Sequence, residues 1–260
     1  MGTRIKIMDL ELDLLAEETL EKEVIKYLSN DFLNVIHFIS AEYIDTYDKN
    51  ELVQETLAEA DLVLPGEKTI LSLFHVDVLE TGGMMVDYHS ALRLCNSKIL
   101  GGKSCYLVLR SKKEARAIKG YLTKRCPFLK IVGVCTADEE MSEEALINDI
   151  NTQVPDIIFL SLKNTDGEAW IHQNKGKLNA KLCVALGSMM DLMLGENVAV
   201  PQIFQTLHLD DIYRFVAKIP YSAYRRRRIF LKKMDNYNNK KLQEQADVSE
   251  ELSDEGNQRE

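Results

Sequence analysis

The ten residues ADLVLPGEKT, Ala60 to Thr69, contain the unit from which the fold of this chain is predicted. A short apolar run, Leu62 to Leu64, has the length and composition of a buried strand. The run stops at Pro65-Gly66, a pair typical of turns, and Glu67 and Lys68 follow directly. The stretch therefore predicts a strand that carries charged side chains just beyond its carboxyl end.

Five further runs share this apolar and β-branched character. They are NVIHFIS (34–40), SCYLVL (104–109), LKIVGVC (129–135), DIIFLSL (156–162) and KLCVALG (181–187). Stretches with helical spacing separate the runs. In one of them Ser142 is a plausible N-cap, with Glu143 and Glu144 in the first turn. Strands that alternate with helices predict an α/β fold, with a mostly parallel, Rossmann-like sheet covered by helices on both faces.

The composition is that of a globular protein, with 45% apolar and 28% charged residues among 260. No run of about 18 apolar residues occurs and the N-terminus soon reaches acidic residues, so we expect neither a spanning helix nor a signal peptide, and a cytoplasmic protein. The cysteines show no C-x-x-C spacing, which favours buried free thiols over a metal or redox site. The histidines His75, His89 and His172 show no ligand spacing. We therefore expect no metal and no other cofactor.

A basic cluster near the C-terminus stands out against the net charge of −9. It contains Arg225, Arg226, Arg227 and Arg228 and follows an amphipathic stretch. This pattern suits an anionic membrane surface or a lipid-linked diphosphate, and the alternative is a basic helix that pairs with the acidic tail. No aromatic-interleaved pattern supports nucleic-acid binding. We predict an α/β domain at 1–200, an amphipathic basic appendage at 201–236 and a disordered acidic tail at 237–260.

The order of segments in the second half of the chain carries a family resemblance. From Pro127 the chain reads PFLKIVGV, an acidic EE, INDINTQVPDIIFLSL, GEAWI, CVALGSMMDLMLG and VPQIFQTLHLDDIYRFVAKIPYSAYRRRR. This order resembles the WecG/TagA/CpsF glycosyltransferases, from roughly Arg4 to Lys233. The resemblance implies transfer of a sugar from a UDP-sugar to a polyprenyl-diphosphate-linked acceptor at the inner face of the cell membrane. It also implies inversion at the anomeric centre without a D-x-D metal motif.

The resemblance also implies roles for individual residues. The family usually has P-D-G where this chain has Pro65-Gly66-Glu67, so Glu67 is the expected general base, one residue further along and one methylene longer. Glu168, in GEAWI, and Gly187 and Asp191, in a G-x-x-x-D-x-x-x-G segment, are the expected donor-binding residues. The four arginines of the basic cluster are expected to bind the acceptor diphosphate and the membrane.

Several other family positions are changed. The family's T-x-N reads Phe38-Ile39-Ser40, the Arg and Asp of its R-x-x-G-x-D-L segment fall on Met84 and His89, and its glycine-rich loop reads Leu109 to Lys113 as LRSKK. We favour solvated side chains over phosphate ligands for the three cations of LRSKK.

These changes leave two hypotheses open. The first is a glycosyltransferase of teichoic-acid or capsule type that transfers an N-acetylhexosamine-type sugar. The second is a catalytically inactive paralogue of the same fold that binds a nucleotide sugar, a lipid intermediate or a partner transferase. The sequence names neither the sugar nor the acceptor, and it leaves assembly into a homo-oligomer open.

Overall fold

The structure is a computed structural model of the chain. It describes residues 3–7, 10–40, 50–66, 70, 86, 90, 93–95, 97–139, 141–162, 166–187 and 190. The chain divides into two units, Met1–Lys218 and Ile219–Glu260, and every described residue lies in the first. The basic appendage and the acidic tail, which the sequence predicts at 201–260, lie outside the described residues.

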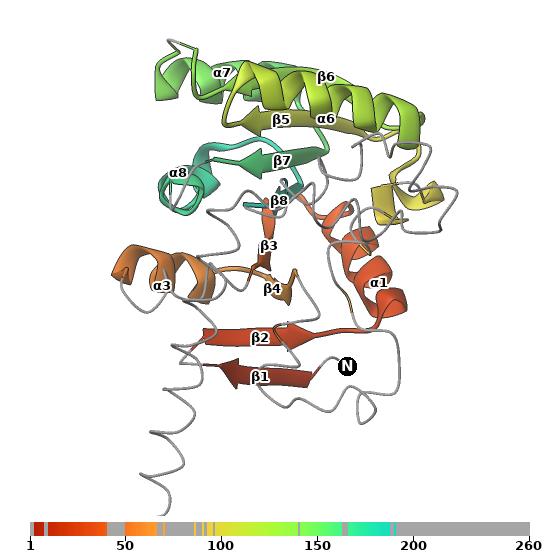
Figure 1. Cartoon of the computed structure of the whole chain (residues 1–260), viewed down its shortest axis with the longest axis vertical. Coiled ribbons are helices and arrows are strands. Elements are labelled where there is room, and N and C mark those ends of the chain that lie inside the picture. Colours follow the sequence, from red (N-terminus) through yellow and green to blue (C-terminus); the bar gives the residue numbers. More distant parts are fainter. Residues whose placement is uncertain are drawn as a thin grey trace, which may run out of the picture. The chain divides into compact units, whose positions relative to one another are not determined.

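A six-stranded parallel sheet forms the centre of the fold (Figure 1). Its strands are β3 (Asn34–Ile39), β4 (Leu62–Pro65), β5 (Ser104–Leu109), β6 (Lys130–Thr136), β7 (Ile157–Ser161) and β8 (Leu182–Ala185). The order across the sheet is β4-β3-β8-β7-β5-β6, and every neighbouring pair is parallel. All six strands predicted from the sequence are confirmed, and so is the mostly parallel, Rossmann-like α/β fold.

Helices cover both faces of the sheet. The helices α1 (Glu17–Tyr27) and α6 (Lys112–Arg125) pack on one face. On the other face lie α7 (Glu143–Gln153) and α8 (Asp166–Asn174), and α3 (Glu51–Ala58) packs against α8. Two short 3-10 helices, η2 (Lys98–Leu100) and η3 (Lys175–Lys177), complete the described elements. Successive residues of a strand alternate between these two layers, as the strand geometry requires.

The start of α7 follows the sequence signal. The hydroxyl oxygen of Ser142 accepts the N–H of Ala145 at 3.2 Å, so Ser142 is the N-cap as predicted. Glu143 and Glu144 occupy the first turn, where carboxylates interact favourably with the helix dipole. Ile147 and Ile150 then enter the apolar layer between α7 and the sheet.

An antiparallel hairpin precedes the sheet, and the sequence prediction missed it. Its strands are β1 (Thr3–Ile7) and β2 (Leu10–Leu14), and β2 lies beside the edge strand β4. The sequence contained a signal for β2, because apolar and acidic residues alternate in LELDL. In the structure all three leucines are buried. The hairpin adds a second, smaller layer next to one edge of the parallel sheet.

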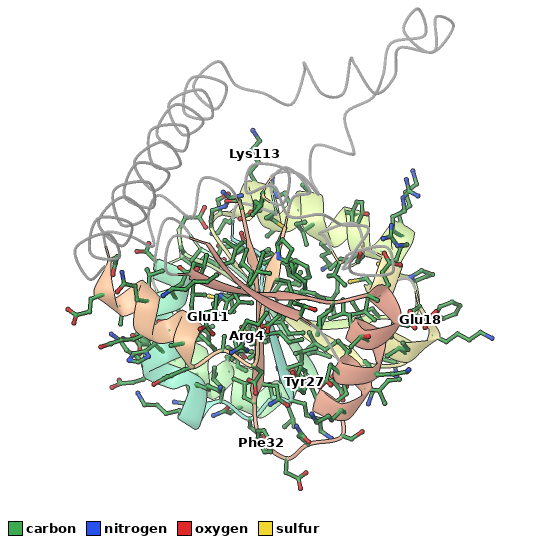
Figure 2. The ribbon with its side chains drawn as sticks, turned by 90° about the horizontal axis from the view of Figure 1, so that it is seen from below. Arg4, Glu11, Glu18, Tyr27, Phe32 and Lys113 are labelled. Atoms are coloured by element: carbon green, nitrogen blue, oxygen red, sulfur yellow. The ribbon has the colours of Figure 1, made fainter. Side chains whose placement is uncertain are left out.

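Asp13 attaches this hairpin to the sheet. Its Oδ2 accepts the backbone N–H of Val63 in β4 at 2.9 Å. Its Oδ1 accepts from Nε of Arg4 at 2.9 Å, and Arg4 also contacts Glu11 at 3.2 Å (Figure 2). A side-chain carboxylate therefore satisfies an N–H on the outer side of the strand β4.

Two more aspartates accept N–H groups at the amino ends of strands. Asp61, just before β4, accepts the N–H of Val35 in the neighbouring β3 at 2.8 Å. Asp156, just before β7, accepts the N–H of Ser104 in the neighbouring β5 at 2.8 Å. In both places the carboxylate pairs with a backbone group that begins a buried parallel strand. The two contacts fix where adjacent strands start relative to one another.

The carboxylate of Asp156 has further partners. It accepts from the hydroxyl of Ser104 at 2.9 Å and contacts Nζ of Lys103 at 3.4 Å. Burial acts to raise the pKa of Asp156, but the hydrogen bonds from Ser104 and the charge of Lys103 outweigh it, so the pKa lies below its ordinary value. The ionised form is therefore the one that the fold stabilises.

The structure also bears on the cysteines and on membrane or metal sites. All five cysteines are buried free thiols, as predicted. None of the helices in the described ranges combines the length and the apolar character needed to cross a bilayer. Over those same ranges, no cluster of three or more His, Cys, Asp or Glu residues could hold a metal ion.

We predict that Asp156→Ala lowers the free energy of unfolding by about 2 to 3 kcal/mol, because it leaves the N–H of Ser104 without its charged acceptor. Asp156→Asn keeps an oxygen acceptor and should cost less. Urea denaturation at neutral pH measures both changes. Asp31→Ala, at an exposed position, is the control and should stay within about 0.5 kcal/mol of wild type.

The difference between wild type and Asp156→Asn should also depend on pH. Since the pKa of Asp156 is lower in the folded state, its contribution is complete above the unfolded value of about 3.9 and is lost as the pH falls through the folded value. Equal stability gaps at neutral and strongly acidic pH would contradict the role of the ionised carboxylate.

Candidate functional site

The carboxyl ends of the six strands meet at one edge of the sheet, because all six run parallel. In open α/β sheets ligands bind at this edge, at the point where the strand order reverses. Here β5 leads through α6 to β6 on one side, whereas β7 leads through α8 to β8 on the other. The reversal lies between the neighbouring strands β5 and β7. The topology therefore places the candidate site at the ends of these two strands.

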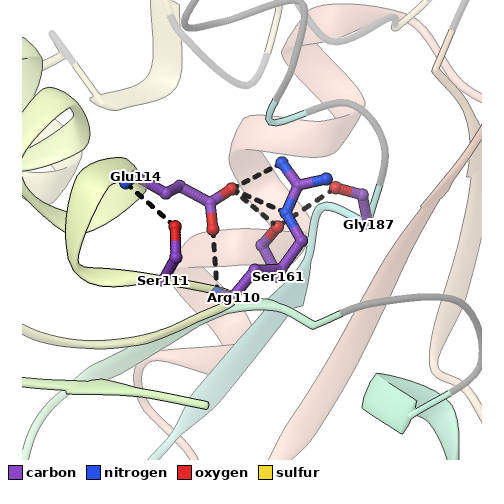
Figure 3. A network of polar contacts seen from close by, with 5 residues as sticks. All are labelled: Arg110, Ser111, Glu114, Ser161 and Gly187. Carbon is purple, nitrogen blue, oxygen red and sulfur yellow. Dashed lines mark hydrogen bonds and ion pairs between the residues drawn. The ribbon is translucent and has the colours of Figure 1, made fainter. Parts of the chain in front are cut away.

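A polar network occupies this point (Figure 3). Oε1 of Glu114, in the first turn of α6, accepts from Nε and Nη2 of Arg110 at 3.0 and 2.6 Å. Oε2 of Glu114 accepts the backbone N–H of Arg110 at 2.8 Å. The hydroxyl oxygen of Ser161 lies 3.4 Å from Oε1 of Glu114 and 3.2 Å from the carbonyl oxygen of Gly187. The network thus joins the ends of β5, β7 and β8.

The sequence contains a signal for this network, although the predicted site did not include it. Ser111 and Glu114 form the S-x-x-E pattern of a capping box, and the hydroxyl of Ser111 accepts the N–H of Glu114 at 3.3 Å. The carboxylate of Glu114 reaches one residue past the usual partner, to the N–H of Arg110. The pattern would have indicated a fixed carboxylate at the start of α6, although not its contact with Ser161.

The N-terminus of α6 holds a second carboxylate of the chain itself. The N–H of Lys112 donates to both oxygens of Asp138, at 3.2 and 3.1 Å. The nearby Thr136 side chain and this N–H of Lys112 lower the pKa of Asp138. The first turn of a helix attracts anions, and in related folds a phosphate binds there. In this structure Asp138 takes that place for the N–H of Lys112.

The prediction that the three cations of LRSKK are solvated is confirmed for Lys112 and Lys113. Lys112 and Lys113 are exposed, and Lys113 projects away from the fold (Figure 2). For Arg110 the expectation was wrong, because its side chain is only 21% exposed and pairs with the buried carboxylate of Glu114. The guanidinium is therefore held in one place at the edge of the sheet.

Two of the expected donor-binding residues are described, and both lie at the carboxyl edge. Glu168 is in the first turn of α8 and is buried. Its backbone oxygen lies 3.4 Å from the hydroxyl of Thr56 in α3, which donates to the carbonyl of Leu52 at 2.7 Å. Gly187 follows β8 with φ of 48°, a left-handed conformation that glycine adopts without strain. The remaining expected site residues, Glu67, Asp191, Arg225, Arg226, Arg227 and Arg228, lie outside the described residues.

The segment Phe38-Ile39-Ser40, where the resemblance places T-x-N, lies at the end of β3. Phe38 is buried in the apolar layer that includes α1, and so contributes to the core. The carbonyl oxygen of Ile39 accepts the N–H of Gly66 at 2.7 Å, which ties the ends of β3 and β4 together. Ser40, directly after β3, is also buried. The residue before Glu67 is therefore fixed at the carboxyl edge by a backbone hydrogen bond.

We predict that Arg110→Ala lowers the free energy of unfolding by about 3 kcal/mol, because it leaves the carboxylate of Glu114 buried without its cation. Lys113→Ala, three residues along at an exposed position, is the matched control and should change it by less than about 0.5 kcal/mol. Chemical denaturation of both variants measures the difference. Equal effects would mean that Arg110 is as weakly held as a surface lysine.

Comparison with known proteins agrees with the family resemblance of the sequence. The profile of the Glycosyl transferase WecG/TagA/CpsF family matches residues 5–230. The N-acetylglucosaminyldiphosphoundecaprenol N-acetyl-beta-D-mannosaminyltransferase of Staphylococcus aureus (strain MRSA252) is 25% identical over 75 residues. That match covers 29% of this chain and 30% of the relative, less than a third of the relative's length. Because the family profile spans most of the sequence, the chain belongs to the WecG/TagA/CpsF glycosyltransferase family.

Proposed function

We propose that the protein is a metal-independent, inverting glycosyltransferase of cell-envelope polysaccharide synthesis, of the teichoic-acid or capsule type. It transfers an N-acetylhexosamine-type sugar from a UDP-sugar to a polyprenyl-diphosphate-linked acceptor. The family match over residues 5–230 carries the proposal. The similar Staphylococcus aureus protein is named as a mannosaminyltransferase for an N-acetylglucosaminyldiphosphoundecaprenol, which supports this class of donor and acceptor.

In the proposed reaction the acceptor hydroxyl oxygen attacks the anomeric carbon of the donor sugar. The bond from that carbon to the diphosphate breaks, UDP leaves with the electron pair, and the hydroxyl proton passes to the carboxylate of Glu67. The position of Glu67 in the chain supports this role. It follows Gly66, which is hydrogen-bonded to the end of β3 at the edge where ligands of α/β sheets bind.

The proposed donor site uses Glu168, Gly187 and Asp191. A carboxylate at Glu168 accepts hydrogen bonds from sugar or ribose hydroxyls. Gly187 lets a ligand approach the backbone closely, because it has no Cβ and adopts a left-handed conformation. Both residues follow the ends of adjacent strands, β7 and β8, which supports one shared site.

A second candidate function is favoured by the carboxylates that bind at the N-terminus of α6. Carboxylates of the chain already bind there, with Asp138 on the N–H of Lys112 and Glu114 on Arg110. The family's glycine-rich loop falls on this segment, and a donor diphosphate at that place would compete with both carboxylates. Under this alternative the protein binds a nucleotide sugar, a lipid intermediate or a partner transferase and does not transfer the sugar.

Calorimetric titration with UDP, UDP-N-acetylmannosamine and UDP-N-acetylglucosamine tests the proposal first. We expect micromolar binding of at least one, followed by sugar transfer to a polyprenyl-diphosphate-linked acceptor. Glu67→Gln should slow transfer by roughly 10²- to 10⁴-fold and leave donor affinity nearly unchanged, since a general base acts in the transition state. Glu55→Gln, at an exposed position in α3, is the matched control.

The outcomes separate the two candidates. Binding without transfer for any acceptor would favour the non-catalytic candidate. Transfer that survived Glu67→Gln unaltered would remove Glu67 from the mechanism. Absence of binding for all three nucleotides would contradict a UDP-sugar donor.

We also propose that the protein is cytoplasmic and binds the inner face of the cell membrane through its basic cluster. Each cation near an anionic surface contributes about 1 kcal/mol. Replacing Arg225, Arg226, Arg227 and Arg228 together by glutamine should therefore reduce sedimentation with anionic vesicles, and added salt should reduce wild-type binding. Zwitterionic vesicles are the control. Unchanged sedimentation of the variant would exclude the cluster as the membrane contact.

A further inference from the structure

The hydroxyl of Ser161 lies between two acceptors. Its oxygen is 3.4 Å from Oε1 of Glu114 and 3.2 Å from the carbonyl oxygen of Gly187 (Figure 3). A serine hydroxyl has one hydrogen, so it donates to only one of the two at a time. Ser161 is 0% exposed, and bulk water therefore does not compete for that hydrogen. The choice between the acceptors depends on the groups around them.

Arg110 determines whether Glu114 or the carbonyl of Gly187 is the stronger acceptor for Ser161. Its Nε and Nη2 both donate to Oε1 of Glu114, the same oxygen that faces Ser161. A carboxylate oxygen has about two lone-pair sites, and these two charge-assisted hydrogen bonds occupy them. While Arg110 is in place, the hydrogen of Ser161 is directed to the carbonyl of Gly187. Without Arg110, the ionised Oε1 becomes the stronger acceptor.

The carbonyl of Gly187 belongs to the turn that follows β8. The N–H of Leu186 donates to the oxygen of Leu160 at 2.9 Å, and the N–H of Met190 donates to the oxygen of Gly187 at 3.4 Å. Gly187 itself is left-handed, with φ of 48°. Loss of the bond from Ser161 would therefore remove one of the hydrogen bonds that the structure describes at this carbonyl, beside the one from Met190.

We propose that Glu114 and Ser161 are positioning residues that couple Arg110 to the Gly187 turn, and through this turn set the affinity for the donor. The Arg110–Glu114 ion pair keeps the hydroxyl of Ser161 on the carbonyl of Gly187 and so holds the turn in its binding conformation. The donor part rests on the proposed function.

Hydrogen exchange of the segment 182–190 tests the coupling without any ligand. Ser161→Ala should speed exchange at the turn roughly threefold to tenfold, as expected for one lost hydrogen bond. Arg110→Ala should do the same, and the double variant should show no further increase, because both changes remove the same bond. If Arg110→Ala does not fold, Arg110→Gln takes its place. The matched controls are Ser29→Ala and Lys113→Ala, both at exposed positions.

The affinity for UDP, measured by calorimetry on the same variants, tests the donor part. Ser161→Ala and Arg110→Ala should weaken UDP binding by a similar threefold to tenfold, again without additivity. The controls should bind UDP like the wild type. The affinity for uridine serves as a reference that lacks the diphosphate.

Each outcome bears on one part of the proposal. Unchanged exchange in Ser161→Ala, or additive increases in the double variant, would overturn the coupling whether or not the wild type binds UDP. Faster exchange with unchanged UDP affinity would overturn the role in donor binding. Failure of the wild type to bind UDP would contradict the proposed function, and hydrogen exchange would still decide the coupling.

Discussion

Backbone N–H groups of buried parallel strands need acceptors, and at three places in this fold aspartate side chains supply them. Asp61 serves β3, Asp156 serves β5, and Asp13 serves the outer edge of β4. Each is a single side chain that satisfies a main-chain donor of another strand. An unpaired N–H in such a place costs as much as a lost hydrogen bond or more. The order and register of the sheet therefore depend on three carboxylates as well as on apolar burial.

At the carboxyl ends of the strands, the carboxylates have a different kind of partner. There the carboxylates pair with cations and helix N–H groups of the site itself, with Glu114 on Arg110 and Asp138 on Lys112. The family resemblance implies a glycine-rich segment here, whose backbone could approach a phosphate. Here side chains that neutralise one another occupy it. The segment therefore presents an arginine held by a buried acid.

The sequence predicted the parts of the structure that local patterns determine. The six parallel strands were found because buried strands read as continuous apolar runs. The β1–β2 hairpin was missed because its alternating pattern is short. The surroundings of Arg110 were misjudged because the burial of its partner Glu114 beside Ser161 depends on strands far apart in the chain. The S-x-x-E pattern at Ser111 was visible, but it indicates only a helix start.

The ligand contacts are expected at the carboxyl ends of the strands, whereas the aspartates that fix the register lie elsewhere. This separation has a consequence for sequence divergence within the family. Substitutions at the carboxyl edge alter ligand contacts, while the aspartates at the amino edge keep the strands in register. Because proteins tolerate mutations only while they remain above a stability threshold, a sheet fixed at one edge can accumulate changes at the other. A lineage with this architecture can lose or rebuild its ancestral active site without losing its fold. The changes that the family resemblance implies at the P-D-G, T-x-N and glycine-loop positions are of the kind that such tolerance allows.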